Sequence, residues 1–432
     1  MANQNNTAQP NQFIQEISDN LNLFIENINC LRETFGYSEG MLNQQKQNAD
    51  KTYADFIAPY KNESGNGSLA IPNEKLRTFK KIEKKKNRAE KAFLLIPPTY
   101  IVSAVSIFDS FLAGLIRCIY NLKPELLRES NMTFLYRDLV NYDSIKEVKK
   151  TIIDATIEKL FRDSHTEQIV WIEKSIDVST LRKFADWPNY IELTERRNLF
   201  VHSDGVVSSQ YINECQNVGY KVDGISIGSR LIADKTYFDQ SYNLLYEMAI
   251  MLTQILINKL YIGKYSEDTS ERDNILITCV FDLIVDKHYK IAINVSNFAR
   301  DEKVFKRNLK DKAFIELNLA QAYKWSDNPD KCQELLDSMD VSIMNNDLKI
   351  PKLTLEEKYD EVYSLMTSVG NRSEILKKES YRDWPIFKEI RKEKEFTETF
   401  KKIFNEELFE SNTTIKVEPD DNTTSEKDIV SN

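Results

Sequence analysis

The sequence predicts an all-α protein, and three observations lead to that fold class. Glycine and proline are scarce, with 11 of each in 432 residues, which disfavours turn-rich β-sandwiches and barrels. Hydrophobic residues make up 41% of the chain and aromatic residues 11%, enough for well-packed interiors. Apolar residues also recur at helical intervals along most of the chain. Its length predicts two or three domains.

The first part of the chain is predicted to be a helical region. We expect residues 1–12, which are rich in Asn and Gln, to be a disordered tail, and residues 13–94 to be mainly helical. A polar interval at 62–68 predicts a loop. The segment 75–91 carries nine Lys or Arg against two Glu. It is either a solvated helix face or a contact surface for nucleic-acid phosphates.

Residues 95–264 form the best-patterned part of the sequence. Pro97-Pro98 is expected to break the chain and to open an amphipathic helix that extends to about residue 119. Two amphipathic helices are expected within 132–162 and a short one at 165–175. Trp187-Pro188 starts a further helix that stops at Ser203-Asp204-Gly205. Residues 220–232, with Asp-Gly between β-branched residues, are the single β-hairpin candidate, and a long apolar helix follows at 238–260.

The C-terminal part is expected to be an array of helix pairs. After a linker at 265–273, residues 274–409 show amphipathic helices of 12–15 residues, a pattern similar to short tetratricopeptide-like repeats. Asn328-Pro329 is expected to begin a helix. Thr354 and Glu357 have the spacing of a capping box. Residues 410–432 are expected to be an acidic disordered tail.

Charge and cysteine usage exclude several classes of function. With 58 basic and 67 acidic side chains, the whole chain is not a polycation that coats nucleic acid. Five scattered cysteines without a CxxC pair, together with only three histidines, exclude a zinc finger or a multi-histidine metal centre. The longest apolar stretch, 248–257, is half a membrane span, and no secretory signal is visible. We therefore expect a cytoplasmic protein without membrane association, metal or other cofactor.

One motif can carry chemistry, Arg197-Asn198-Leu199-Phe200-Val201-His202, at the end of the helix that Trp187 begins. Asn198 and His202 are four residues apart and share a helix face, with Arg197 beside them. The trio can present a guanidinium, an amide and an imidazole to one ligand. The structural alternative is that Arg197 and His202 only cap carbonyls and pair with Glu195 or Asp204.

With these residues in view, residues 95–262 resemble the HEPN superfamily, whose motif is an Arg followed four to six residues later by a His. Arg197 matches the Arg, Asn198 the polar residue that often follows it, and His202 the His. The stretch 187–211 is similar to a bacterial branch that joins this domain to C-terminal helical repeats. The resemblance implies a helical bundle that acts as a metal-independent endoribonuclease, in antiphage defence or as a toxin.

The implied chemistry fits these residue types. The 2′-OH of RNA is the nucleophile, so the enzyme must move protons and stabilise a phosphorane. His202, at a helix C-terminus that favours its cationic form, suits a general acid. Arg197 suits the phosphoryl oxygens, and Asn198 can orient the histidine or donate to phosphate. Because one histidine cannot be both acid and base, the resemblance implies a homodimer that brings two motifs together.

The remaining expectations concern supporting residues and partners. Asp109 is either a supporting residue or an ordinary buried Asp, and Arg196 either grips the RNA backbone or forms a solvent-facing salt bridge. His165 and His288 are expected to be surface or capping residues. The expected substrate is single-stranded or looped RNA, including tRNA anticodon loops. The alternative is a non-catalytic scaffold for dimerisation or RNA binding, whose repeats bind a protein partner.

Overall fold

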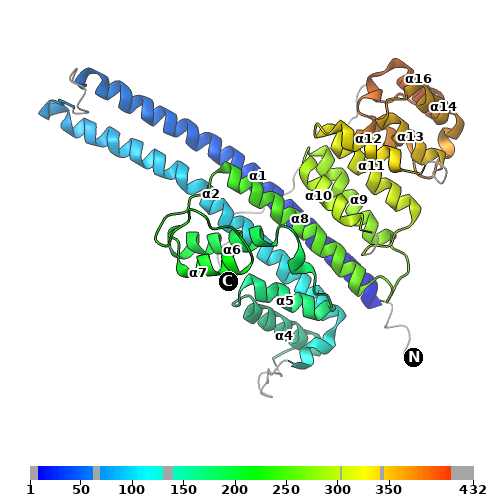
Figure 1. Ribbon diagram of the computed structural model, residues 1–432, viewed down its shortest axis with the longest axis horizontal. Coiled ribbons are helices and arrows are strands. Elements are labelled where there is room, and N and C mark those ends of the chain that lie inside the picture. Colours follow the sequence, from blue (N-terminus) through cyan, green and yellow to red (C-terminus); the bar gives the residue numbers. More distant parts are fainter. Residues whose placement is uncertain are drawn as a thin grey trace. The chain divides into compact units, whose positions relative to one another are not determined.

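The computed structural model describes residues 8–61, 69–129, 139, 141–301, 304–340 and 345–409 (Figure 1). These residues are mostly helical and contain no β-strand, which confirms the all-α fold class. The chain forms two compact units, Met1–Lys312 and Ala313–Asn432. The first unit combines the regions 13–94 and 95–264 that the sequence analysis separates, and it extends beyond the linker expected at 265–273.

The first unit is built around two 50-residue helices, α1 (Ala8–Ile57) and α2 (Asn73–Leu122) (Figure 1). A short 3-10 turn, η1 (Ala58–Tyr60), follows α1. Buried apolar residues of α1 recur every three or four positions, and Phe24 contacts Phe108 and Phe111 of α2 at ring-centroid distances of 5.8 and 5.1 Å. Gly114 permits close approach here, because a Cβ at this position would lie 2.0 Å from Asn20 Oδ1.

The break expected at Pro97-Pro98 does not occur, because α2 continues through both prolines. A proline inside a helix removes an amide donor and crowds the preceding turn, at a cost of about 3 kcal/mol. Packing against α1 offsets that cost: Pro97 is buried, the Tyr100 ring lies 5.3 Å from the Phe35 ring, and the Tyr100 hydroxyl lies 2.9 Å from Ser38 Oγ. The residues on both sides of the prolines therefore belong to one helix.

The other helices of the first unit pack around this pair. They are η2 (Pro124–Glu129), α4 (Ile145–Leu160), α5 (His165–Ile176), η3 (Leu181–Lys183), α6 (Trp187–His202), α7 (Ser209–Asn217), α8 (Lys235–Leu260), α9 (Ser270–Val285) and α10 (Tyr289–Ala299). The long apolar α8 contacts both α1 and α2, as its composition predicts. Most of the other helix expected within 132–162 lies outside the described residues.

Helix α6 starts and stops where the sequence predicts. Pro188 lies in its first turn, and Asp204 and Gly205 end it with φ values of 51° and 79°. The amides of Ser203 and Gly205 both donate to the Leu199 carbonyl, at 2.8 and 3.0 Å. A left-handed residue at a helix end allows such bonds and turns the chain sharply. This stop places His202 at the last position of the helix.

The expected β-hairpin at 220–232 is wrong, because this segment forms consecutive turns without paired strands. The amide of Ile225 donates to Val222 O, and that of Ser229 donates to Ser226 O, both at 3.0 Å. Gly224 and Gly228 have positive φ values. Two tight turns so close together leave no run long enough to form a ladder. A single bridge, Val206 to Arg230, joins the segment to the end of α6.

The remainder of the chain consists of short helices. They are α11 (Leu309–Trp325), α12 (Pro329–Ser338), α13 (Asn346–Leu355), α14 (Tyr359–Val369), η4 (Gly370–Arg372), α15 (Lys378–Asp383), η5 (Pro385–Phe387), η6 (Ile390–Lys392) and α16 (Lys394–Phe404). As expected, Pro329 opens α12. The capping box expected at Thr354 and Glu357 is wrong, because Thr354 lies inside α13 and Glu357 is a turn residue with φ 60°.

One turn recurs three times between α9 and α14. Lys287, Asp327 and Glu357 each have φ near 60° and each separates two helices. The amide of the next residue returns in every case to the carbonyl five positions earlier, the bond of a Schellman motif: His288 to Leu283, Asn328 to Tyr323 and Lys358 to Leu353. The repeated turn agrees with paired helices, and the tetratricopeptide-like character stays a prediction.

The expected loop at 62–68 and acidic tail at 410–432 lie outside the described residues, whereas α1 begins at Ala8, inside the tail expected at 1–12. Within the described ranges one helix, α2, is long and apolar enough to cross a membrane, contrary to the expectation that the longest apolar stretch is half a membrane span. Of its most apolar stretch, 44% is buried in the protein.

Candidate functional site

The three motif residues on α6 line one pocket of about 350 Å³. Arg197, Asn198 and His202 contribute from α6, Asp109 contributes from α2, residues 161–164 contribute from the turn before α5, and His165 contributes from the start of α5. Asn198 and His202 are one turn apart and face the same pocket, as their spacing predicts. The structure thus brings together residues that are up to 93 positions apart in the sequence.

Asp109 is the residue that connects the three helices of this pocket. Its Oδ2 accepts from Arg197 Nη2 at 2.7 Å, and its Oδ1 lies 3.0 Å from His165 Nε2. The side chains are largely enclosed, with exposed fractions of 20% for Asp109, 19% for Arg197 and 9% for His165. Of the two expectations for Asp109, this geometry favours a supporting residue, because its carboxylate holds the motif arginine directly.

The expectation that His165 is a surface or capping residue is wrong. His165 is the first residue of α5 and is buried, with its ring edge-on to the Tyr190 ring at 6.0 Å. Ser164 and Glu167 form a capping box that starts α5 and so places His165 in its first turn. The capping box is visible in the sequence, but no local signal connects His165 with Asp109, 56 positions away.

His288 is not a capping side chain either. It precedes α10 without making a capping hydrogen bond, and its Nδ1 lies 2.8 Å from Arg32 Nη1 of α1. Burial, together with the Arg32 charge, lowers the pKa of His288, because both disfavour a second positive charge. This histidine does not line the pocket of the motif.

The pairing of the motif residues differs from the structural alternative. Arg197 pairs with Asp109 rather than Glu195, and Asp204 pairs with Arg230. Arg197 Nη1 also donates to Asn198 Oδ1 at 3.2 Å. His202 is exposed, and no ion pair or hydrogen bond of its side chain occurs within the described part of the chain. Its imidazole is therefore free to meet a ligand.

Glu195 forms the inner wall of the pocket. Asn198 Nδ2 lies 3.5 Å from Glu195 Oε1, at the limit of a hydrogen bond. Burial raises the pKa of Glu195, and the nearby Glu214 carboxylate adds to this effect, whereas His165 and Arg197 oppose it. A carboxyl group with a raised pKa carries its proton to higher pH and can then donate a hydrogen bond.

Arg196 belongs to a buried network behind the pocket rather than to its surface. The expected salt bridge exists, from Arg196 Nε to Glu192 Oε1 at 2.6 Å, but it is enclosed and not solvent-facing. Glu192 also accepts from the Tyr211 and Tyr237 hydroxyls, each at 2.7 Å. The Arg196 guanidinium lies 4.1 Å from the centre of the Tyr237 ring. These contacts attach α6 to α7 and α8, so Arg196 positions the motif helix.

The pocket itself is not strongly positive. Its lining includes the carboxylates of Asp109, Asp163 and Glu195 and the guanidinium groups of Arg162 and Arg197. Within the described residues there is no group of three or more His, Cys, Asp or Glu placed to hold a metal ion. Comparisons of the chain with protein-family models, curated proteins and solved structures found no match.

The basic segment 75–91 occupies the first half of α2, toward the end of the α1–α2 pair at which α2 begins (Figure 1). Eight of its nine cationic side chains are exposed. The ninth, Lys86, is half-buried, with Nζ 4.0 Å from Asp50 Oδ1 and 5.3 Å from the Tyr53 ring centre. The Phe79 ring of this segment faces α1 and lies 6.0 Å from the Tyr53 ring, whereas Leu76 is exposed. The exposed lysines and arginines thus form a continuous positive face.

Proposed function

We propose that this chain is a metal-independent endoribonuclease of HEPN type that cleaves RNA through attack by the substrate's own 2′-OH. The observation that carries the proposal is that Arg197, Asn198 and His202 line one pocket, with Asp109 bound to Arg197. This arrangement supplies a charged donor fork, an amide and an accessible imidazole at one place. Cytoplasmic location and a role in antiphage defence or toxicity belong to the same proposal.

The reaction assigns a task to each residue. The 2′-oxygen attacks phosphorus and loses its proton, the bond from phosphorus to the 5′-oxygen breaks, and that oxygen gains a proton. The products are a 2′,3′-cyclic phosphate and a 5′-OH. His202, the last residue of α6, donates the proton that the 5′-oxygen gains. Arg197 stabilises the negative charge that develops on the phosphoryl oxygens.

The structure changes the argument for a homodimer. A second chain is expected because the motif alone supplies one histidine for both proton transfers. His165 lines the same pocket as His202, so a single chain offers two imidazoles there. His165 Nε2 is held by Asp109, which gives that ring a fixed orientation. The homodimer remains part of the proposal, and it rests on the resemblance alone.

The substrate is single-stranded or looped RNA, because in-line attack needs a flexible sugar–phosphate backbone. The exposed basic face of α2 holds flanking phosphates through charge rather than through sequence. Cleavage is therefore expected to weaken as salt rises. This surface compensates for a pocket whose own carboxylates outnumber its guanidinium groups.

A non-catalytic scaffold is the second candidate, and one observation favours it. Asp109 binds Arg197 at 2.7 Å and neutralises much of the charge that a phosphorane requires. In that function the motif only joins α2, α5 and α6, and the C-terminal helices bind a protein partner. The two candidates differ in what they predict for the removal of His202, which supports no other side chain. The enzyme loses its cleavage activity, and the scaffold keeps its function.

Incubation of the purified chain with total cellular RNA in EDTA tests the proposal. The wild type is expected to produce fragments with 2′,3′-cyclic phosphate ends. His202→Ala and Arg197→Ala are each expected to reduce the rate by 10²-fold or more, the usual scale of proton transfer and charge stabilisation. Arg230→Ala, which removes an exposed arginine that pairs with Asp204, is the matched control and retains the wild-type rate.

Two results contradict the enzyme proposal. One is cleavage at the wild-type rate by His202→Ala with an unchanged circular dichroism spectrum. The other is cleavage of a substrate whose 2′-OH at the scissile position is replaced by hydrogen, because that substrate lacks the nucleophile. If neither the wild type nor any variant produces fragments, the result supports the scaffold function.

A further inference from the structure

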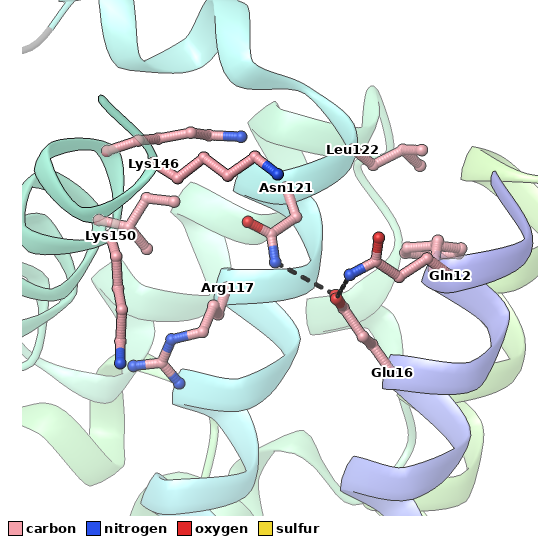
Figure 2. A pocket seen from close by; sticks show the side chains of 10 residues that line it. Gln12, Glu16, Arg117, Asn121, Leu122, Lys146 and Lys150 are labelled. Carbon is pink, nitrogen blue, oxygen red and sulfur yellow. Dashed lines mark hydrogen bonds between the residues drawn. The ribbon is translucent and has the colours of Figure 1, made fainter. Parts of the chain in front are cut away.

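A second pocket, of about 480 Å³, lies between α1, α2 and α4 and shares no residue with the motif pocket (Figure 2). Its walls combine two kinds of surface. The apolar part consists of the buried Phe13 and Ile153 together with the half-buried Leu122. The polar part carries four cationic side chains: Arg117, Lys146, Lys149 and Lys150.

Figure 2 shows how the polar groups are distributed. Lys146 and Lys150 extend from α4 on one side, and Lys150 runs toward Arg117 of α2. Asn121 of α2 lies in the centre. Glu16 extends from α1 on the opposite side, where its carboxylate accepts from Gln12 Nε2 at 2.6 Å and from Asn121 Nδ2 at 3.1 Å. The pocket therefore has a cationic end and a carboxylate end.

The cationic end carries uncompensated charge. Arg117 pairs with Asp154 at 2.7 Å, but no ion pair of Lys146, Lys149 or Lys150 occurs in the part of the chain that the structure describes. Lysines at positions i, i+3 and i+4 of one helix repel one another and destabilise it. An anion bound beside these ammonium groups offsets part of this repulsion. The lysine cluster thus favours a bound phosphate over an empty pocket.

The carboxylate end has the opposite preference. Glu16 is held by two amide donors, and its oxygens have further lone pairs that can accept from a ligand N–H. A simple inorganic anion gains nothing from this end and is repelled by it. A ligand that satisfies both ends needs a phosphate, a flat apolar body for the surface around Phe13 and Ile153, and N–H donors on its far edge.

We propose that this pocket binds a guanine nucleotide, with the phosphate among the lysines and the base against the apolar wall. Guanine has adjacent N–H donors on its Watson–Crick edge, which a carboxylate can accept together. The proposal does not depend on RNA cleavage, since the nucleotide is either free or a unit of a bound strand. It assigns a binding site outside the motif pocket.

Titration calorimetry of the full-length chain with GMP at low salt tests the proposal. GMP is expected to bind at least tenfold more tightly than inorganic phosphate, which engages only the lysines. Lys146→Ala/Lys149→Ala/Lys150→Ala is expected to weaken GMP binding at least tenfold. The matched control, Lys394→Ala/Lys401→Ala/Lys402→Ala on α16, removes the same charge from exposed positions outside both proposed sites and retains binding.

Glu16→Gln separates the two ends. It is expected to weaken GMP binding and to strengthen phosphate binding, because it removes both a hydrogen-bond acceptor and a repelling charge. Equal affinity of wild type and the α4 triple variant, or equal affinity for GMP and phosphate, overturns the proposal. Circular dichroism melting confirms that each variant is folded.

Competition identifies the source of the nucleotide. A single-stranded deoxyoligonucleotide rich in G lacks the 2′-OH and is not a substrate of the proposed cleavage. If it displaces GMP at lower concentration than free GMP does, the site holds a unit of a strand. If it fails to displace GMP, the site holds a free nucleotide. Because no step of these measurements involves cleavage, they can fail while the ribonuclease proposal stands, and the reverse also holds.

Discussion

Replacement of Asp109 by Asn tests whether this carboxylate organises the motif pocket. The change preserves shape but removes the charge that Arg197 and His165 share, at 2.7 and 3.0 Å. The matched control is Asp154→Asn on α4, whose partner Arg117 also lies on α2 and also at 2.7 Å. The two ion pairs differ mainly in burial, since the side chains of the second are 42% and 44% exposed.

The expected magnitudes follow from that difference. A hydrogen bond between charged groups contributes about 1.5–3 kcal/mol, and removing one partner of an enclosed pair also leaves the other charge without compensation. The asparagine keeps one acceptor oxygen, so we expect a loss of about 2–3 kcal/mol in the free energy of unfolding. An exposed ion pair contributes about 0–1 kcal/mol, which sets the expected loss for Asp154→Asn.

Urea unfolding followed by circular dichroism measures both variants. Because the chain has two compact units, the unfolding transition of the unit that contains α2 is the one to compare between the two variants. Equal losses for the two variants, or a smaller loss for Asp109→Asn, refute the argument that enclosure makes Asp109 the organising residue.

Two further predictions concern stability. Gly114→Ala is expected to lower the free energy of unfolding by about 1–3 kcal/mol, because the new methyl group meets Asn20 of α1. Gly36→Ala, where a new methyl group has nothing within 4 Å, is expected to raise that free energy by about 0.5–1 kcal/mol. Equal effects of the two substitutions in urea unfolding contradict the close approach at Gly114. Burial raises the pKa of Glu247 to about 7, despite the bond from Asn294, so the folded state binds the extra proton between about pH 4.5 and 7. Stability is therefore expected to fall by up to about 3 kcal/mol as pH rises through that window, and Glu247→Gln, compared by urea midpoints at pH 5 and 8, is expected to remove the dependence.

The sequence predicts much of the fold because helix signals are local. The start of α6 at Trp187-Pro188, its end at Asp204-Gly205 and the apolar α8 depend on residues within a few positions of each other. The failures occur where distant contacts override a local preference. Packing of α1 on α2 carries a helix through Pro97-Pro98, and neighbouring turns at Gly224 and Gly228 displace the expected hairpin.

The candidate site divides in the same way. Arg197, Asn198 and His202 lie on one helix, so their spacing shows in the sequence that they share a face. Asp109 and His165 join them only through the packing of α2, α5 and α6. Contacts across 88 and 56 positions leave no periodic signal in one sequence. The sequence therefore predicts one histidine in the pocket, whereas the structure places two there, His165 and His202.

Helix α2 connects the two candidate sites and also keeps their tests separate. Asp109 and Arg117 are two turns apart on this helix, about 12 Å at 1.5 Å per residue. Helix α4 contributes lysines near its start to the nucleotide pocket, and the residues just after its end line the motif pocket. A substitution among those lysines therefore leaves the contact of Asp109 with Arg197 intact. A variant of the α4 lysines can therefore lose GMP binding without losing cleavage. A variant of the motif pocket can lose cleavage without losing GMP binding.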